Sequence, residues 1–253
     1  MHIWLCLLIL PLAALLFQAR PLLAQILCER RMRAGDYHGA LRRLRWIGLG
    51  IPNVFMLHKE ALILSLYGRP AEAEPLYRTA LGMLRKGVPY PRERLHSSLG
   101  YALLDLGRYP EAEQCFHRAI EAGDATGNSQ DGLAELRLTQ GVEIEKALAY
   151  SRYAIERAKR RTAAEAPGVY YVHEAWALAL LGRTAEASAS LAQALHAPAR
   201  EGRANASLHW RAGTVLSILQ QPAEARRQFQ LGANVDAHGK YGARCARDLA
   251  GLL

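Results

Sequence analysis

The sequence has little lysine, few cysteines and no long run of β-branched residues. Because β-branched runs are scarce while Ala, Leu and Arg are abundant, the composition disfavours strands and predicts an all-α protein. The cysteines lie far apart and form no C-x-x-C pair, so their spacing supports neither a zinc site nor a dense disulfide framework. We expect each to behave as a small buried apolar residue. They are Cys6, Cys28, Cys115 and Cys245.

The signatures of common active sites are also absent from the sequence. It contains neither a G-x-x-x-x-G-K-S/T phosphate loop nor a G-x-S-x-G nucleophile elbow. Its nine histidines include no pair at H-x-x-x-H or H-E-x-x-H spacing, and His173-Glu174 lacks the second histidine. The sequence therefore predicts that the chain is not an enzyme and holds neither a cofactor nor a metal ion.

Lysine is scarce although the chain is basic. The formal net charge is +9, and 27 of the 32 cationic residues are arginine. A basic balance can indicate nucleic acid, an anionic membrane surface or acidic partners. Arginine in place of lysine throughout a chain often reflects genomic base composition, so nucleic-acid binding is not favoured and stays an alternative.

The amino terminus carries the one long apolar stretch. Residues 3–19 contain no charge, and as a helix they would be about 25 Å long, the short end of what spans a bilayer. Three interpretations compete: an uncleaved membrane anchor, a cleaved signal peptide and a packed soluble helix. No basic residue other than His2 precedes the run, and Leu16 to Ala19 fit a cleavage site poorly, so the anchor is favoured. We assign residues 1–20 to this segment and residues 21–253 to a second region.

The charges around the apolar stretch predict its orientation. No lysine or arginine precedes it, whereas seven arginines follow within a short distance. The positive-inside tendency then places the body of the protein on the cytoplasmic side, where the same arginines could contact anionic headgroups. These arginines are Arg20, Arg30, Arg31, Arg33, Arg42, Arg43 and Arg45.

The remainder of the chain repeats itself. Six similar stretches align on alanines separated by 33, 39, 35, 40 and 38 residues, and a period in this range indicates a solenoid. Most stretches begin with a glycine, which can adopt the left-handed conformation that ends a helix. Gln220 replaces that glycine in the last stretch, at a cost of about 1 kcal/mol if the left-handed turn is kept. The aligned alanines are Ala40, Ala73, Ala112, Ala147, Ala187 and Ala225.

Each stretch also marks the start of a helix. Pro70, Pro110 and Pro222 lie where the first turn of that helix would be, and there the missing N–H costs nothing. Behind them, apolar residues follow a spacing of i, i+4, i+7 and i+8, which is helical. The sequence therefore predicts a series of helical hairpins, with an irregular loop between Gly123 and Gly132.

The clearest unit resembles a tetratricopeptide repeat (TPR). It carries Leu99-Gly100, then Leu103, Gly107, Tyr109, Ala112, Phe116 and Ala119. The resemblance covers roughly residues 21–236, but the opening Trp of the family is His96 here and the spacing often exceeds 34 residues. It implies an α-solenoid of about six antiparallel helix–turn–helix repeats. Residues 240–252 would form a C-terminal capping helix, and the hydrophobic helix would precede the solenoid.

The same resemblance implies a function. In the family, the first helix of each unit lines a concave groove that binds a peptide or a partner helix. It implies a non-enzymatic scaffold or adaptor that binds protein partners and is tethered to a membrane by residues 3–19. The alternatives are an exported protein with a signal peptide that helps to assemble an envelope complex, and a basic nucleic-acid-binding repeat protein. The groove residues predicted here are Phe55, His58, Lys59, Arg94, Tyr101, Asp105, His173, Trp176, Trp210 and Arg211.

Overall fold

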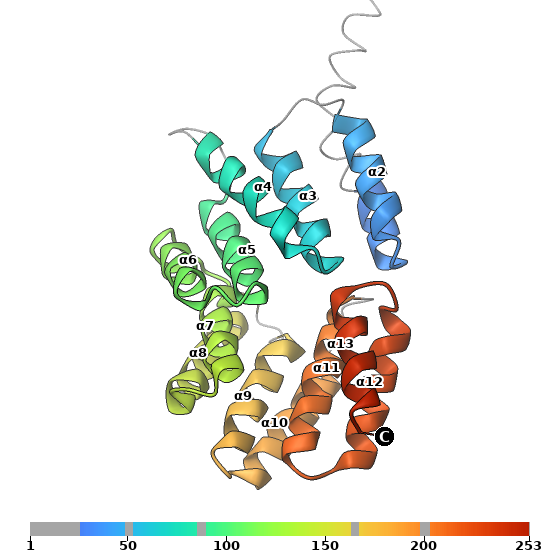
Figure 1. Ribbon diagram of the computed structural model, residues 1–253. Helices are drawn as coiled ribbons and strands as arrows, with labels where there is room; N and C mark the ends of the chain where they lie inside the picture. Colours follow the sequence, from blue (N-terminus) through green and yellow to red (C-terminus); the bar gives the residue numbers. More distant parts are fainter. Residues whose placement is uncertain (1–25, 49–52, 85–89, 163–166, 198–202, 253) are drawn as a thin grey trace, which may run out of the picture.

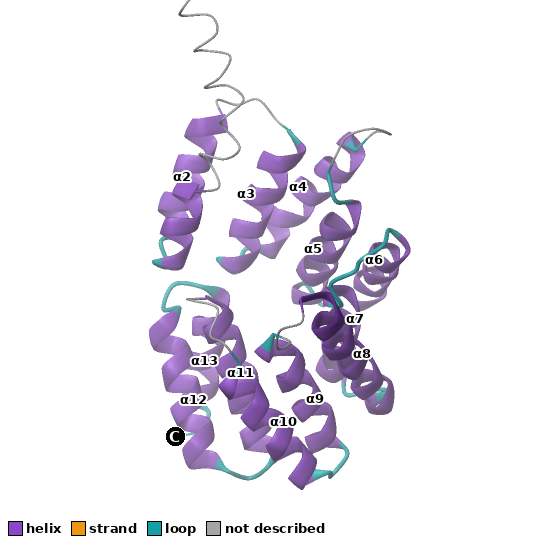
Figure 2. Ribbon diagram, turned by 180° about the vertical axis from the view of Figure 1, so that it is seen from behind, coloured by secondary structure: helices purple, strands orange, loops and turns teal. Residues whose placement is uncertain are grey.

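The computed structural model describes residues 26–48, 53–84, 90–162, 167–197 and 203–252, and all regular structure in these ranges is helical (Figures 1 and 2). The helices are one over residues 26–33, then α2 (Tyr37–Gly48), α3 (Val54–Leu66), α4 (Pro70–Met83), α5 (Arg92–Asp105), α6 (Tyr109–Glu121), α7 (Asn128–Gln140), α8 (Ile144–Thr162), α9 (Gly168–Leu180), α10 (Thr184–His196), α11 (Arg203–Ile218), α12 (Pro222–Val235) and α13 (Lys240–Ala250).

Consecutive helices pack in pairs. Helix 26–33 pairs with α2, and the pairs α3–α4, α5–α6, α7–α8, α9–α10 and α11–α12 follow, with α13 packed on α11 and α12. This arrangement confirms the all-α solenoid of about six hairpins with a final helix. The predicted apolar segment, residues 3–19, and the boundary at residue 20 lie outside the described residues. Among the helices that the structure describes, none is long and apolar enough to cross a membrane.

The turns between paired helices have the conformation that the sequence predicts. Gly68, Gly107 and Gly182 have φ of 86°, 72° and 73°. A residue with a Cβ atom would be strained at these backbone angles, whereas glycine is not. Gln220 adopts the same left-handed conformation, with φ of 58°. The structure therefore keeps the turn in the last hairpin even without glycine.

Glycines also let neighbouring helices approach each other closely. The Phe116 ring of α6 lies against Gly100 of α5 and Gly132 of α7, where an added Cβ would come within 2.7 Å and 2.4 Å of ring atoms. Phe229 of α12 lies in the same way against Gly213 of α11, at 2.5 Å. These rings pack directly on helix backbone: Phe116 joins its own hairpin to the next one, and Phe229 joins the two helices of the α11–α12 hairpin.

The loop predicted between Gly123 and Gly132 is shorter than expected, because α7 already begins at Asn128. The carboxylate of Asp124 accepts hydrogen bonds from the backbone N–H groups of Thr126 and Ser129, both at 2.8 Å. Gly127 has φ of 82° and directs the chain into the helix. An early turn stabilised by Asp124 thus makes Ser129 to Asp131 helical.

The solenoid curves back on itself, so that the last helices lie beside the first ones (Figures 1 and 2). The Tyr37 hydroxyl at the start of α2 donates a hydrogen bond to Asp236 at 2.5 Å, although the two residues are 199 positions apart. Helix α13 also contacts α3. The two ends of the superhelix therefore support each other, and the final helix packs on the first repeats as well as on its own unit.

The left-handed residue in the last turn gives a stability prediction. Gln220→Gly removes the strain of a side chain at positive φ and should raise the free energy of unfolding by about 1 kcal/mol. The reciprocal exchange, Gly182→Gln, should lower it by a similar amount, since an added Cβ there has open space and only the backbone is strained. Urea unfolding of both variants tests this, and a destabilised Gln220→Gly protein would contradict it.

Candidate functional site

The interior of the superhelix is lined by the first helices of the hairpins and by α13. Its centre holds three ionisable side chains of opposite sign and one histidine, from three helices, which we name the inner network: Asp131 and Glu135 of α7, Arg211 of α11 and His173 of α9. His173 Nδ1 lies 2.7 Å from Asp131 Oδ1, and an Arg211 guanidinium nitrogen donates to Glu135 Oε1 at 2.5 Å. None of the four side chains is more than 4% exposed.

The charges of the inner network compensate one another. Burial disfavours the charged form of Glu135, but the attraction of Arg211 outweighs it and lowers the pKa of Glu135 to about 2. Burial raises the pKa of Asp131, although His173 acts against this change. Arg211 also donates to the Tyr241 hydroxyl at 3.2 Å. Because a buried charge is stable only when it is paired, these residues hold α7, α11 and α13 in one arrangement.

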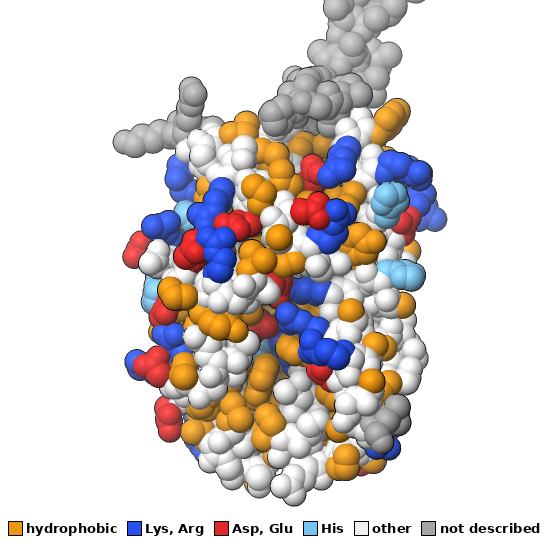
Figure 3. Space-filling model, viewed as in Figure 1, with side chains coloured by type: hydrophobic (Ala, Val, Ile, Leu, Met, Phe, Trp, Pro, Cys, Tyr) orange, Lys and Arg blue, Asp and Glu red, His pale blue; other side chains and the backbone are white. Residues whose placement is uncertain are grey.

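A second set of ion pairs crosses the interior. Asp105 at the end of α5 accepts hydrogen bonds from Lys240 at 2.6 Å and from Arg244 at 3.0 Å, both on α13. Acidic and basic side chains accordingly gather in the recess near the centre of the face shown in Figure 3. The space left beside them is a pocket of about 230 Å³, lined among others by Tyr101, Asp105 and Arg211. Much of the predicted concave groove is thus filled by the chain itself.

The structure brings several of the predicted groove residues together at this centre. Asp105, His173 and Arg211 belong to the ion pairs just described, and Tyr101 lines the same pocket. The Tyr101 hydroxyl donates to the backbone carbonyl of Asn128 at 2.9 Å. All four residues lie in the interior, and most of their polar atoms are bound within the chain, whereas His173 Nε2 and Arg211 Nε are buried without a hydrogen-bond partner.

Two tryptophans continue this cluster. The rings of Trp176 and Trp210 meet edge to face with centroids 6.3 Å apart, and Trp210 lies 6.0 Å from Tyr241. The Arg244 guanidinium stacks over Trp210 at 4.7 Å, and the indole N–H of Trp210 donates to Asp248 at 2.8 Å. Trp176 is only 8% exposed. Both tryptophans therefore pack between helices in this structure.

The other predicted residues lie apart from the centre. Phe55 packs against the core and Lys59 pairs with Glu29 at 3.2 Å. His58 is buried, with its Nδ1 2.5 Å from the Tyr90 hydroxyl. Arg94 alone of the predicted set is exposed. The ten predicted positions thus do not form one open surface.

The residues predicted from the sequence do not include Asp131, Glu135 and Lys240. Asp131 and Glu135 are four residues apart, which places both on one face of a helix. That spacing is a usable signal, but the loop predicted between Gly123 and Gly132 includes Asp131. The predicted final helix contains Lys240 but gives it no partner, since nothing local points to a residue 135 positions away.

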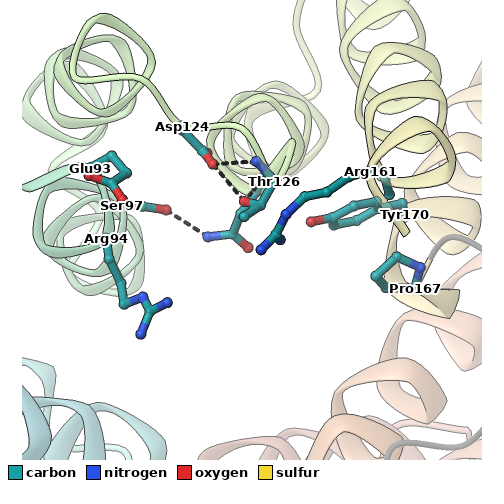
Figure 4. Close-up of a pocket in the computed structure, with 10 residues that line it drawn as sticks. Glu93, Arg94, Ser97, Asp124, Thr126, Arg161, Pro167 and Tyr170 are labelled. Atoms are coloured by element: carbon teal, nitrogen blue, oxygen red, sulfur yellow. Dashed lines mark hydrogen bonds between the residues drawn. The ribbon is translucent and has the colours of Figure 1, made fainter. Parts of the chain in front are cut away.

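An open pocket lies at the side of the superhelix, and we name it the side pocket. It has a volume of about 310 Å³ and is formed by the start of α5, the loop before α7, the end of α8 and the start of α9. Figure 4 shows Arg161 reaching from α8 toward its middle, with Arg94 of α5 at its rim and Tyr170 on the far side. Its lining residues are Glu93, Arg94, Ser97, Asp124, Thr126, Asn128, Ala158, Arg161, Pro167 and Tyr170.

The cations of the side pocket are free to bind a ligand. Both carboxylate oxygens of Asp124 already accept hydrogen bonds, from Thr126 and Ser129. Burial alone would raise the pKa of Asp124, but these hydrogen bonds outweigh burial and lower it. Arg94 and Arg161 are exposed and form no ion pair or hydrogen bond with any described residue. The first turn of α9, which begins beside Pro167, has no side-chain cap and adds positive potential. The side pocket therefore holds two unpaired cations beside one unpaired carboxylate, Glu93, and this excess of positive charge favours an anionic group.

Residues that could carry metal chemistry are not grouped in the described parts of the chain. There, no three His, Cys, Asp or Glu side chains lie where they could hold a metal ion. Cys28, Cys115 and Cys245 are buried free thiols, as predicted, and burial raises the pKa of each one. Thiols of this kind are poor nucleophiles.

Comparison with known proteins supports the fold. No protein-family model matches the chain, and no curated protein matches it in sequence. Among solved structures, a tetratricopeptide repeat protein from Parabacteroides merdae ATCC 43184 superposes with a TM-score of 0.65 at 18% identity, over 93% of this chain and 83% of that one. PilW, a widely conserved type IV pilus biogenesis factor, superposes with a TM-score of 0.57 at 16% identity, over 68% of this chain and 76% of that one.

The APC/C hetero-tetramer Cut9–Hcn1 gives a TM-score of 0.61 at 14% identity, over 94% of this chain but only 46% of that one. This chain thus spans less than half the length of that neighbour. Together the three similarities show a divergent tetratricopeptide-type solenoid fold.

The buried ion pair of the inner network gives a second prediction. Arg211→Met leaves Glu135 buried without its hydrogen-bonded cation and should lower the free energy of unfolding by about 3–5 kcal/mol. Arg211→Met with Glu135→Leu removes both charges and should recover a large part of that loss. Urea unfolding measures both. If the double variant were as unstable as the single one, the loss would come from packing and not from the unpaired charge.

A third prediction concerns the pH dependence of stability. Burial, with smaller contributions from Arg94 and Lys59, lowers the pKa of His58 from 6.5 to about 4. The unfolded chain therefore takes up the proton first, so the contribution of His58 is fully present above pH 6.5 and is lost as the pH falls toward 4. Between pH 7 and pH 5 the free energy of unfolding should fall by about 2 kcal/mol.

The control for this prediction is His58→Gln, which can still hydrogen-bond to Tyr90 and Ser98 but does not titrate. Its stability should fall less than that of the natural protein over the same pH range. The same decrease in both proteins, measured by urea unfolding, would show that other groups cause it.

Proposed function

We propose that this chain is a non-enzymatic scaffold that binds protein partners, and that its side pocket binds an acidic side chain of a partner. The observation that carries the proposal is the pair Arg94 and Arg161, which lie in one open pocket and have no partner among the described residues. Arginine binds carboxylates with two parallel hydrogen bonds and is enriched at binding hot spots. The solenoid fold supports the same role, since neighbours of this fold include subunits of larger assemblies.

The side pocket is a better binding site than the centre of the superhelix. At the centre, Arg211 and Glu135 bind each other, and Asp105 binds Lys240 and Arg244. A partner that entered there would have to replace buried ion pairs, which is unfavourable. In the side pocket, a partner's carboxylate breaks no ion pair of the two arginines. The proposed site therefore differs from the groove that the sequence predicted, and keeps only Arg94 of it.

The proposal includes a membrane tether at residues 3–19, with the repeat domain on the cytoplasmic side. It is motivated by the uncharged apolar run and by the arginines that follow it. The exported form with a cleaved signal peptide is the alternative location. Amino-terminal sequencing of the mature protein distinguishes the two, because an uncleaved anchor keeps residues 3–19. Full-length protein in the soluble fraction without detergent would reject the tether.

The side pocket gives a fourth prediction. Arg94→Ala with Arg161→Ala removes both cations and should weaken partner binding by about tenfold or more, since a hydrogen bond to a charged group is worth about 1.5–3 kcal/mol. Partners are captured from mild detergent extracts with the tagged natural protein, identified by mass spectrometry, and their affinities for both proteins are measured. Circular dichroism confirms that the variant is folded.

The matched control is Arg157→Ala with Arg160→Ala, which removes the same charge from exposed positions of α8 outside the side pocket. It should leave the affinity unchanged. Equal losses in both variants would show a general charge effect. If the captured partner were a nucleic acid bound with a steep salt dependence, the basic repeat alternative would replace the scaffold.

A further inference from the structure

Helix α2 has an outward face that contacts nothing in the described chain. Its apolar side is buried through Tyr37, Leu41 and Leu44. Arg42, Arg43 and Trp46 lie on the opposite side at spacings of three and four residues, so they form one patch. We name this patch the α2 outer face.

The α2 outer face is unusual in its exposure. Trp46 is 75% exposed, the largest value among the exposed large hydrophobic residues of the described chain. Arg42 and Arg43 are exposed and form no ion pair or hydrogen bond there. In contrast, Trp176 and Trp210 are packed between helices. The face thus combines an uncovered indole with two unpaired cations.

The carboxylates near this face are already engaged. Residues 26–48 contain six arginines and only two acidic residues, Glu29 and Asp36. Glu29 pairs with Lys59, and Asp36 pairs with Arg31, whose nitrogen lies 2.5 Å from its carboxylate. Helix α2 itself contains no acid. The hairpin therefore has a positively charged outer surface, and its unpaired cations would be stabilised by an external anion.

The position of Trp46 in the fold points toward the start of the chain. The first helix of the hairpin runs from residue 26 to a turn at residues 34–36, and α2 runs back from residue 37, so Ile26 and Trp46 lie at the same end of the hairpin. Ile26 is 57% exposed there. The opposite end of α2 carries Tyr37, which binds Asp236. The apolar end of this hairpin thus points away from the C-terminal repeats.

The length of the chain limits how far this end can be from the apolar run. Position 26 lies seven residue steps after position 19, and the chain between them spans at most about 25 Å even when fully extended. If residues 3–19 are held in a bilayer, Ile26 lies within that distance of its surface. Trp46 is at the same end of the hairpin and therefore comes close to the headgroups.

We propose that the α2 outer face lies on an anionic lipid surface, with Trp46 at headgroup depth and with Arg42 and Arg43 against lipid phosphates. This proposal rests on the membrane tether proposed above and adds the lipid class and the contacting side chains. Tryptophan favours the membrane interface because its ring is amphipathic. Each arginine near an anionic leaflet contributes about a fivefold preference for the bound state. The tether supplies proximity, and this face fixes how the solenoid is oriented on the membrane.

The experiment uses the full chain, reconstituted from mild detergent into vesicles of phosphatidylcholine alone or of phosphatidylcholine with phosphatidylglycerol. Acyl chains brominated near the headgroup quench nearby tryptophans. Subtracting the signal of a Trp46→Phe variant isolates Trp46 from the other three tryptophans. Quenching of Trp46 is expected to be strong in the anionic vesicles and weak in the neutral ones, and to decrease as salt is added.

Two charge variants test the contacts. Arg42→Gln with Arg43→Gln should reduce the quenching of Trp46 in anionic vesicles to the level seen with neutral lipid. Arg157→Gln with Arg160→Gln removes the same charge from α8 and should leave it unchanged. Equal quenching of Trp46 in both lipids would overturn the role of anionic headgroups, and so would equal effects of the two charge variants.

The outcomes also separate this proposal from the proposed function. If the protein floats with the vesicles but Trp46 is not quenched, the membrane tether is supported and the proposed contact of the α2 outer face with lipid is overturned. Protein that does not float at all overturns both the tether and the face, while partner capture by Arg94 and Arg161 is measured independently. Loss of a captured partner, with no change in quenching, on Arg42→Gln with Arg43→Gln would show that the face binds protein.

Discussion

Arg211 makes the interaction on which the arrangement of the repeats depends. Its guanidinium is only 2% exposed, and it joins Glu135, 76 residues earlier in the chain, to Tyr241, 30 residues later. A charge that is removed from water and bound at fixed positions tolerates little rotation of one hairpin against another. Apolar contacts between hairpins would permit a range of superhelical curvatures. This ion pair, together with the pairs of Asp105, selects the curvature at which the interior closes.

Closure of the interior has a consequence for binding. In an open solenoid the first helices of the hairpins offer their polar side chains to a partner. Here the side chains of α5, α7, α11 and α13 satisfy one another across the interior. Groups that are free for an external ligand are therefore found at the margin, at the side pocket and on the outer face of α2. Stability of the closed form and binding at the centre compete for the same residues, and the structure resolves this competition in favour of stability.

The repeated features of the fold could be predicted from the sequence because they are local. The turn glycines, the prolines of the first helical turn and the left-handed Gln220 each depend on a few neighbouring residues. The contacts between Tyr37 and Asp236, and between Asp105 and Lys240, depend instead on how much each hairpin is rotated relative to the one before it, added up along the superhelix. A local sequence pattern does not determine this total rotation. The candidate site was less predictable for the same reason: Arg94 was chosen for its place on α5, but Arg161 comes from the end of a second helix, which the resemblance does not associate with binding.

The arginines of this chain divide according to what surrounds them. Where a carboxylate lies within reach, as for Arg211, Arg244 and Arg31, the guanidinium joins two segments of the fold. Where no carboxylate binds it, as for Arg94 and Arg161 of the side pocket and for Arg42 and Arg43 of α2, the cation is left on the surface. An unpaired guanidinium gains more from a phosphate or carboxylate ligand than a paired one, because it gives up no ion pair on binding. The distribution of carboxylates, more than that of the arginines themselves, thus determines where this protein can bind an anionic partner.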